Sequence, residues 1–328
     1  MPLSHDSNVE GLDGEHRHAL SQALGNVLAT DAALVTFAQI IDGLPICDIA
    51  WDTRGPKLTP QHPINSHVEL CPGARDMAEE FRDDFKLEAL VFKPELLPSF
   101  QSSSTSSRGF ALRLLELTSS AVHQIAVLLF QLNLRVHDRT TTDNLNVDEA
   151  TSWECPPDMR ARVVPHPTLF TQSHFVAHEQ CPDGIADMVG YWAEDRILGG
   201  VILFDHSSPW NEQDIEPNAS IYCGRDKITY RICQLLDDQQ SRLIEFLRAR
   251  EKQPEEQRER PNGPLPILPS SDNRTRIDQG DAIPVHKPRL RMQQYMDRRV
   301  LNELDYPELK FDEQMERFNR LSSQPKDE

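Results

Sequence analysis

The histidines His174 and His178 lie four positions apart and form the sequence pattern that comes nearest to a metal site. On a helix this spacing would place both imidazoles on one face, but a zinc ion needs three or four ligands. A Pro182-Asp183-Gly184 turn follows, which argues against a helix, and no third ligand stands at a suitable spacing. We therefore predict no metal site and interpret both histidines as loop or surface residues, with a metal site as the weaker alternative.

Acidic side chains in the same region could supply paired carboxylates for acid–base catalysis. The acids considered are Asp187, Glu194, Asp195 and Asp205. Acids are common at strand ends and in turns, and only a buried neighbourhood would tune the pKa of such a carboxyl for catalysis. We therefore favour a structural interpretation and keep catalysis as the alternative.

His123 stands in the most apolar segment, one turn from Ser119 and Ser120 and two turns from Glu116. Histidine is the commonest acid–base group, yet a buried histidine on a core helix is usually hydrogen-bonded scaffolding. A serine nucleophile would need a sharp turn, and the chain has no G-x-S-x-G motif. The catalytic residues stay undetermined, and the weak candidates are His123, Asp187, Glu194 and His206.

No motif for a cofactor is visible. Gly199-Gly200 matches neither phosphate-loop pattern and lies before a strand-like run rather than a helix. The six cysteines include no C-x-x-C pair of the kind that marks structural zinc sites, and their scatter is not that of a disulfide framework. We therefore predict reduced thiols and no cofactor.

The composition limits the classes of partner. The chain of 328 residues carries a formal net charge of −18. Nucleic acids and anionic membranes attract basic surfaces, so neither kind of partner is expected. The N-terminal residues lack an apolar signal-peptide core, and the longest apolar run, Ile125 to Phe130, is too short to span a bilayer. These features predict a soluble intracellular protein, cytoplasmic with the nucleus left open.

The N-terminal half is predicted to be mainly helical. Residues 1–13 form a loose tail, and helical periodicity follows over 15–41, where Thr30 and Asp31 leave two shorter helices equally open. The further expectations here are a helix over 73–92, a disordered Ser-rich loop at 99–107 and a long buried helix over 109–136.

The block 164–236 changes to a strand pattern. The runs 185–193 and 197–205 predict a hairpin around three polar residues, and Gly199-Gly200 predicts a bulge or a close backbone approach. The other elements expected are a strand at 166–172, a strand pair at 219–223 and 228–235, and a helix at 239–250.

The C-terminal quarter is predicted to lie outside the core. Residues 251–288 are rich in Pro and charge and indicate a linker or disordered insert. Residues 289–328 are predicted to form two amphipathic helices, at 289–304 and 307–321, through which we expect a protein partner to bind.

Three stretches resemble a group of filamentous-ascomycete proteins that carries no assigned activity. They are SSAVHQIAVLLFQL, IADMVGYWAEDRILGGVILFDH and KITYRICQLLDDQQ, and the resemblance covers roughly 109–247. It implies a fungal, lineage-restricted protein and supplies no catalytic residue.

These patterns together predict an α+β fold with a single domain over 14–250. An antiparallel β-meander packs against the long buried helix, with additional N-terminal helices and a C-terminal helical tail. The function expected is that of an accessory, interaction or regulatory protein without chemistry of its own. The alternative is a noncanonical enzyme of fungal secondary metabolism that uses acid–base chemistry in a mostly apolar pocket.

Overall fold

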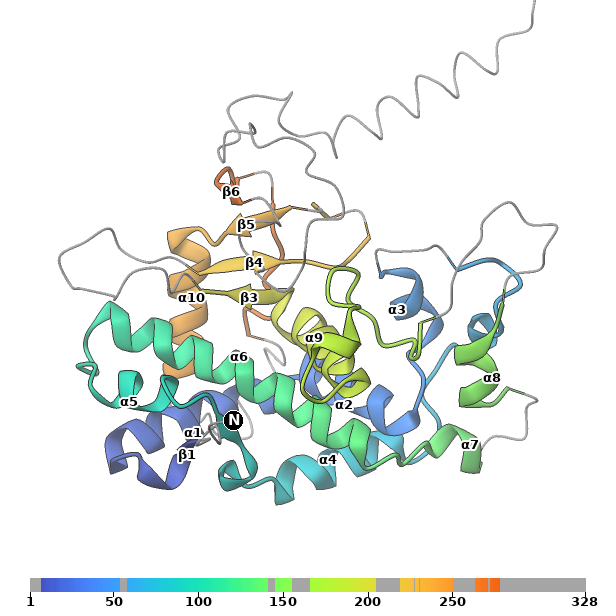
Figure 1. Ribbon diagram of the computed structural model, residues 1–328, viewed down its shortest axis with the longest axis horizontal. Coiled ribbons are helices and arrows are strands. Elements are labelled where there is room, and N and C mark those ends of the chain that lie inside the picture. The colour runs from blue at the N-terminus through green and yellow to red at the C-terminus, as the bar shows by residue number, and fades with distance from the viewer. Residues whose placement is uncertain are drawn as a thin grey trace, which may run out of the picture.

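A computed structural model describes residues 7–53, 58–140, 145–154, 166–204, 219–226, 228–229, 231–249, 263–270 and 272–277. Helices form most of the molecule, and a small antiparallel sheet lies along one side of them (Figure 1). The predicted α+β class is therefore confirmed. The tail helices expected at 289–328 lie outside the described residues.

The N-terminal periodicity divides into α1 (Gly14–Leu28) and α2 (Asp31–Asp42). Asp13 caps α1 by accepting from the backbone of Glu15 and His16, and Thr30 caps α2 by accepting from Ala33. Such caps satisfy backbone N–H groups that the first turn leaves unpaired. The predicted alternative of two shorter helices is therefore correct, and Thr30, as the N-cap of α2, separates them.

The predicted loose tail at 1–13 is wrong for its described part. Residues Ser7–Asn8 form β1, which pairs antiparallel with β2 (Val91–Phe92), and η1 (Val9–Gly11) follows. Val9 is fully buried in the main core. One apolar side chain and strand partners 83 and 85 residues later order this segment, and neither is visible as a local pattern.

The connection between α2 and the long central helix contains several short elements. They are α3 (Cys47–Trp51), η2 (Pro63–Ser66), α4 (Ala74–Asp84), η3 (Leu87–Ala89) and α5 (Leu96–Gln101). The helix predicted over 73–92 is thus shorter, because the chain becomes extended at Phe85 and then forms β2. The disordered loop predicted at 99–107 is wrong, because this Ser-rich segment forms the end of α5 and the N-cap of the next helix, with backbone hydrogen bonds in between.

The central helix α6 (Arg108–Gln131) is the long buried helix that the sequence predicts. It packs along α9 (Ile185–Leu198) and also contacts α1, α2 and α5. Its length and composition alone would allow it to cross a bilayer, but 72% of that candidate window is buried inside the protein. Burial on several sides explains why its apolar stripe is so broad.

Helix α9 replaces the first strand of the predicted hairpin at 185–205. Its buried residues Met188, Val189, Trp192 and Ala193 follow helical spacing, and the three polar residues 194–196 form its last turn. Gly199 ends the helix in the left-handed region at φ 103°, and a Cβ at Gly200 would lie 2.9 Å from the backbone of Tyr222. The hairpin is therefore wrong, whereas the close backbone approach at the two glycines is confirmed.

The sheet is a four-stranded antiparallel meander of β3 (Val201–Leu203), β4 (Ser220–Tyr222), β5 (Ile232–Gln234) and β6 (Arg276–Ile277), in that order (Figure 1). The strand pair predicted at 219–223 and 228–235 is confirmed as β4 and β5. Residues 166–172 form no strand.

The predicted helix at 239–250 is α10 (Asp237–Arg248), with acids in its first turn as expected. The linker predicted at 251–288 is wrong for 263–270 and 272–277, and its other residues lie outside the described part. Leu265 and Ile267 are buried in the main core, and β6 pairs with β5. High Pro and charge content concealed these few anchoring side chains.

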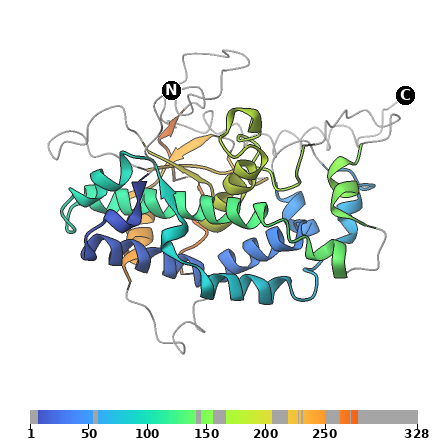
Figure 2. The ribbon, with the colours of Figure 1, turned by 60° about the horizontal axis from the view of Figure 1, so that its bottom comes forward.

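The remaining elements gather at one end of the molecule. They are α7 (Val136–Thr140) and α8 (Val147–Ser152), which lie at the same end as α3 (Figures 1 and 2), while η4 (His178–Gln180) precedes α9. A small apolar cluster here, separate from the main core, consists of Leu44, Ile64, Leu145, Val147 and Ala150. The described residues thus form one large core and two small clusters, the second of which consists of Tyr222 and Ile232.

Candidate functional site

Three of the four weak catalytic candidates meet in space. His123 on α6 lies between two carboxyls of α9, with its Nδ1 2.9 Å from Oε1 of Glu194 and its Nε2 2.9 Å from Oδ1 of Asp187. The two acids are seven positions apart, which on a helix places them on one face. The fourth candidate, His206, lies outside the described residues. We call His123, Asp187 and Glu194 the acid–base cluster.

The electrostatics of this cluster favour a charged imidazole. Burial alone would lower the pKa of His123, but its hydrogen bonds to Asp187 and Glu194 outweigh burial and raise that pKa to about 9. Burial opposes the ionised form of Asp187, yet its hydrogen bond to His123 holds that carboxyl's pKa below the ordinary value. The backbone N–H of Asp183 also donates to Asp187 at 2.8 Å. An imidazolium–carboxylate pair therefore lies between the two helices.

The acid–base cluster is closed by its own contacts. Both ring nitrogens of His123 are engaged, the Tyr191 ring meets the imidazole edge-on at 4.5 Å, and Gly190 leaves no room for a Cβ beside it. A general base needs a free lone pair within reach of its substrate. In this arrangement the cluster joins α6 to α9 rather than presenting a base.

The other sequence candidates lie apart from the acid–base cluster. His174 stacks on Tyr222 with ring centroids 3.8 Å apart, and His178 forms an ion pair with Glu179 at 3.4 Å. Asp195 lies between Arg196 and Arg225, and Asp205 lies outside the described residues. The described residues do contain a group of potential metal ligands, but neither His174 nor His178 belongs to it.

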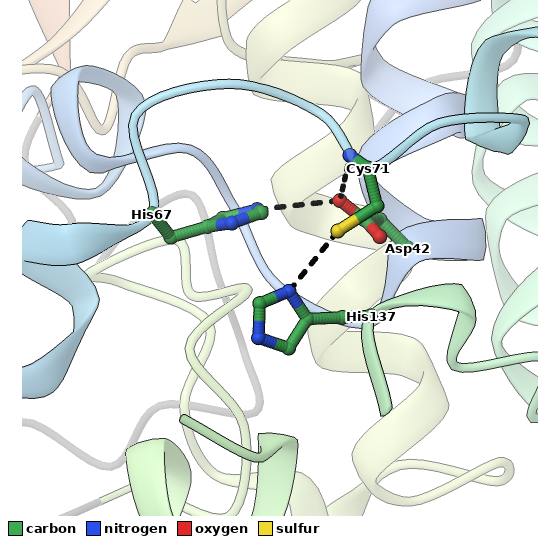
Figure 3. A group of neighbouring side chains, drawn as sticks. All are labelled: Asp42, His67, Cys71 and His137. Carbon is green, nitrogen blue, oxygen red and sulfur yellow. Dashed lines mark hydrogen bonds and ion pairs between the residues drawn. The ribbon is translucent and has the colours of Figure 1, made fainter. Parts of the chain in front are cut away.

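That group consists of Asp42, His67, Cys71 and His137, which we call the metal centre (Figure 3). One donor atom from each lies within 4.8 Å of the other three, and the side chains are between 0% and 6% exposed. Asp42 is the last residue of α2, and His137 lies on α7. His67 and Cys71 come from the connection between η2 and α4.

Second contacts fix the orientation of His137. Its Nε2 lies 3.0 Å from the Leu145 carbonyl oxygen, which can only accept, so Nε2 carries a proton. In the neutral ring Nδ1 then presents a lone pair, and this atom faces Cys71 Sγ at 3.1 Å. Metal-bound histidines are commonly held in this way, with one nitrogen on the metal and the other donating to a backbone carbonyl.

Two polar atoms of the metal centre have no hydrogen-bond partner among the described residues. They are Oδ1 of Asp42 and Nε2 of His67, and both are buried. The other Asp42 oxygen accepts from the Cys71 backbone N–H at 3.0 Å and lies 3.3 Å from His67 Nε2. Buried polar atoms without partners are rare in folded proteins, and an ion is one of the recognised explanations.

The position of Asp42 adds an electrostatic reason for a cation. The carboxyl is fully buried at the C-terminal end of α2, where the helix dipole is negative. A divalent cation with the Asp42 carboxylate, a Cys71 thiolate and two neutral imidazoles would form a group with no net charge. Burial of charges is tolerated when they are paired in this way.

The sequence held one local signal for the metal centre, the H-x-x-x-C spacing of His67 and Cys71. The prolines around it, Pro60, Pro63 and Pro72, are typical of an extended connection and do not by themselves indicate a metal site. Asp42 lies 25 residues before His67, and His137 lies 66 residues after Cys71. Only the fold brings the four residues together. No protein-family model, curated protein or solved structure matches the chain, so both clusters must be interpreted from their chemistry.

Proposed function

We propose that the protein binds one zinc ion at the metal centre and acts as an accessory, interaction or regulatory protein without chemistry of its own. The observation that carries this proposal is that two buried atoms, Asp42 Oδ1 and His67 Nε2, make no hydrogen bond inside a group of four potential ligands, although His67 Nε2 lies 3.3 Å from the other Asp42 oxygen. A metal would supply the partner that both atoms need.

The donor set favours zinc over the common hard cations. Calcium and magnesium prefer oxygen ligands, whereas one thiolate, two imidazoles and one carboxylate suit zinc. With zinc–ligand bonds of about 2.0–2.3 Å, tetrahedral coordination separates neighbouring donors by roughly 3.3–3.8 Å. The Cys71–His137 and Asp42–His67 donor pairs, at 3.1 and 3.3 Å, lie close to that range.

The burial of the ligands favours a structural zinc ion over a catalytic one. Structural sites use four protein ligands, whereas catalytic sites keep one position for water or substrate. All four side chains here are buried, and they join three separate parts of the chain. Structural zinc can contribute about 10–16 kcal/mol of apparent binding free energy to small domains.

The proposal is tested by measuring the zinc content of the purified full-length protein by elemental analysis. We expect about one zinc per chain, and strong loss of zinc in Cys71→Ser. Cys47→Ser is the matched control, because Cys47 Sγ contacts Asn65 close by but is not a ligand. A zinc content near zero in the wild type after growth and dialysis with zinc would contradict the proposal.

A second candidate function is acid–base catalysis in fungal secondary metabolism, and the convergence of His123, Asp187 and Glu194 is what supports it. The cavity of about 380 Å³ between α1 and the end of α4 is lined by other residues, among them Leu24, Leu28 and Phe85. Catalysis therefore requires the cluster to open. Unchanged metabolite output in His123→Ala, with the protein still folded, would exclude this candidate.

We also propose a fungal, soluble, cytoplasmic protein that binds its partner through 289–328. The net charge of −18 supports solubility and argues against nucleic-acid partners. A pull-down with the full chain and with 289–328 deleted tests the partner. Recovery of the same partner by both chains would contradict a role for the tail.

A further inference from the structure

The small apolar cluster beside the metal centre is too limited to hold its surroundings by packing alone. It contains Leu44, Ile64, Leu145, Val147 and Ala150 and is separate from the main core. Small units without a sufficient core usually depend on disulfides or a metal. We call residues 58–69, with η2, and residues 137–140 and 145–153, with α8 and α7 beyond Val136, the metal lobe, because Val136 and Leu70 pack on the main core.

The metal centre lies where the metal lobe meets the main body. Asp42 ends α2, and Cys71 is buried in the main core. His67 directly follows η2, which carries Ile64 of the small cluster, and His137 belongs to α7. A zinc ion would therefore join two ligands of the body to two ligands of the lobe.

Contacts of the lobe depend on the same ligands. The ring of His137 donates to the carbonyl of Leu145, which belongs to the small cluster. The backbone of His67 donates to Ile64 at 3.0 Å and accepts from Cys47 at 2.7 Å. Movement of either histidine would thus disturb hydrogen bonds and packing inside the lobe.

The chain that follows α3 is held differently from the metal lobe, whereas the start of α3 is bonded to His67. The guanidinium of Arg196 on α9 donates to the Asp52 carboxylate at 2.6 Å and to the Thr53 hydroxyl at 3.0 Å. The backbone N–H of Asp226 donates to the Asp52 carbonyl at 2.8 Å. These contacts fasten the chain after α3 to the body without any metal ligand. They give an internal reference next to the lobe.

We infer that zinc at the metal centre controls the local folding of the metal lobe, while the main core and the end of α3 keep their structure without it. This inference rests on the proposed zinc binding and adds a regulatory role to it. Local units can open well below the free energy of global unfolding when they have few buried apolar contacts of their own. Loss of zinc would then change the surface formed by η2, α7 and α8 and leave the remaining fold intact.

Hydrogen exchange with mass-spectrometric detection tests the inference on the full-length protein. Exchange is compared in zinc, after removal of zinc with a chelator, and after zinc is restored. Without zinc, we expect at least about tenfold faster exchange in peptides of the metal lobe, which include the hydrogen-bonded amides of Asn65 and Ala150. Peptides of α6 and of 51–53 should change little, and restored zinc should restore protection.

The outcomes separate the inference from the proposal on which it rests. If zinc binds and exchange in the lobe is unchanged by its removal, the inference is overturned and zinc binding stands. Acceleration that includes α6 to the same extent also overturns it, because the effect is then global. If zinc does not bind at all, the proposed function fails and the inference fails with it. Cys71→Ser should exchange like the zinc-free wild type, and Cys47→Ser should respond to zinc like the wild type.

Discussion

The acid–base cluster and the metal centre are both buried groups of histidine and carboxylate, yet they differ in how their polar atoms are satisfied. His123 has a carboxyl partner at 2.9 Å on each ring nitrogen. In the metal centre, Asp42 Oδ1 and His67 Nε2 have no hydrogen-bond partner among the described residues. The acid–base cluster, whose ring nitrogens are both bonded, is therefore interpreted as a structural ion cluster. The metal centre, which keeps buried atoms without a hydrogen bond, is interpreted as a site for a metal ion.

The largest difference between the two regions should be seen when ligands are removed. His137→Ala removes a proposed zinc ligand and also the hydrogen bond to the Leu145 carbonyl. Losing a residue that only hydrogen-bonds a metal ligand typically lowers metal affinity about 10–100-fold, so we expect a larger fall in zinc affinity here. Chelator should lower the melting temperature of the wild type but not of this variant. Differential scanning calorimetry with and without chelator measures both effects, and equal chelator sensitivity in the two proteins would contradict the assignment.

Removing His123 should destabilise the fold without affecting zinc. His123→Ala leaves two buried carboxyls without their cationic partner, for which we expect a loss of about 3–5 kcal/mol in the free energy of unfolding. Urea denaturation measures that loss, and elemental analysis should still find zinc at the wild-type ratio. A variant that is as stable as the wild type would show that the α6–α9 ion cluster contributes nothing.

The two regions should respond to pH in opposite directions. The pKa of His123 is about 9 in the folded protein, above the ordinary value of 6.5, so its contribution is complete below 6.5 and is lost as pH rises towards 9. A shift of this size corresponds to about 3 kcal/mol at most. Zinc binding should instead weaken as pH falls, because protons compete for the histidine and cysteine ligands.

Denaturation series in zinc and in chelator at several pH values measure these two slopes. The loss of stability between pH 6.5 and 9 should be smaller in His123→Ala, because the imidazole that titrates in this range is gone. If the variant keeps the alkaline loss, another group causes it.

The smallest expected effect concerns the close approach beside His123. A Cβ at Gly190 would lie 2.6 Å from the imidazole, so Gly190→Ala should cost about 1–3 kcal/mol through overpacking. Gly25→Ala in α1 is the matched control, because a Cβ there meets nothing within 4 Å. We expect this control to be neutral or slightly stabilising by helix propensity. Equal effects of both changes, measured by thermal unfolding, would refute tight packing around the cluster.

Sequence patterns predicted the parts of the fold that depend on local chemistry. The break at Thr30 and the apolar stripe of α6 each depend on residues a few positions apart. Helix α9 was mistaken for a strand because its short apolar run fits either period. The strand contacts of β1 and β6 involve partners far along the chain, which local patterns do not show.

The same distinction applies to the two clusters. His123, Asp187 and Glu194 were recognised one by one, but their pairing depends on the packing of α6 against α9. The metal centre was missed because only His67 and Cys71 are close in sequence, and Asp42 and His137 are placed by the fold. A metal site assembled from distant segments leaves no spacing pattern of the kind that marks zinc fingers.

A cobalt titration followed by visible absorption is the most direct test of whether Asp42, His67, Cys71 and His137 form a closed metal site. Cobalt commonly replaces zinc, and its absorption reports coordination geometry and thiolate ligation. We predict saturation at one cobalt per chain, with the intense visible bands of tetrahedral coordination and a thiolate charge-transfer band that is absent in Cys71→Ser. Absence of saturable binding, or the weak bands of octahedral cobalt, would contradict the account.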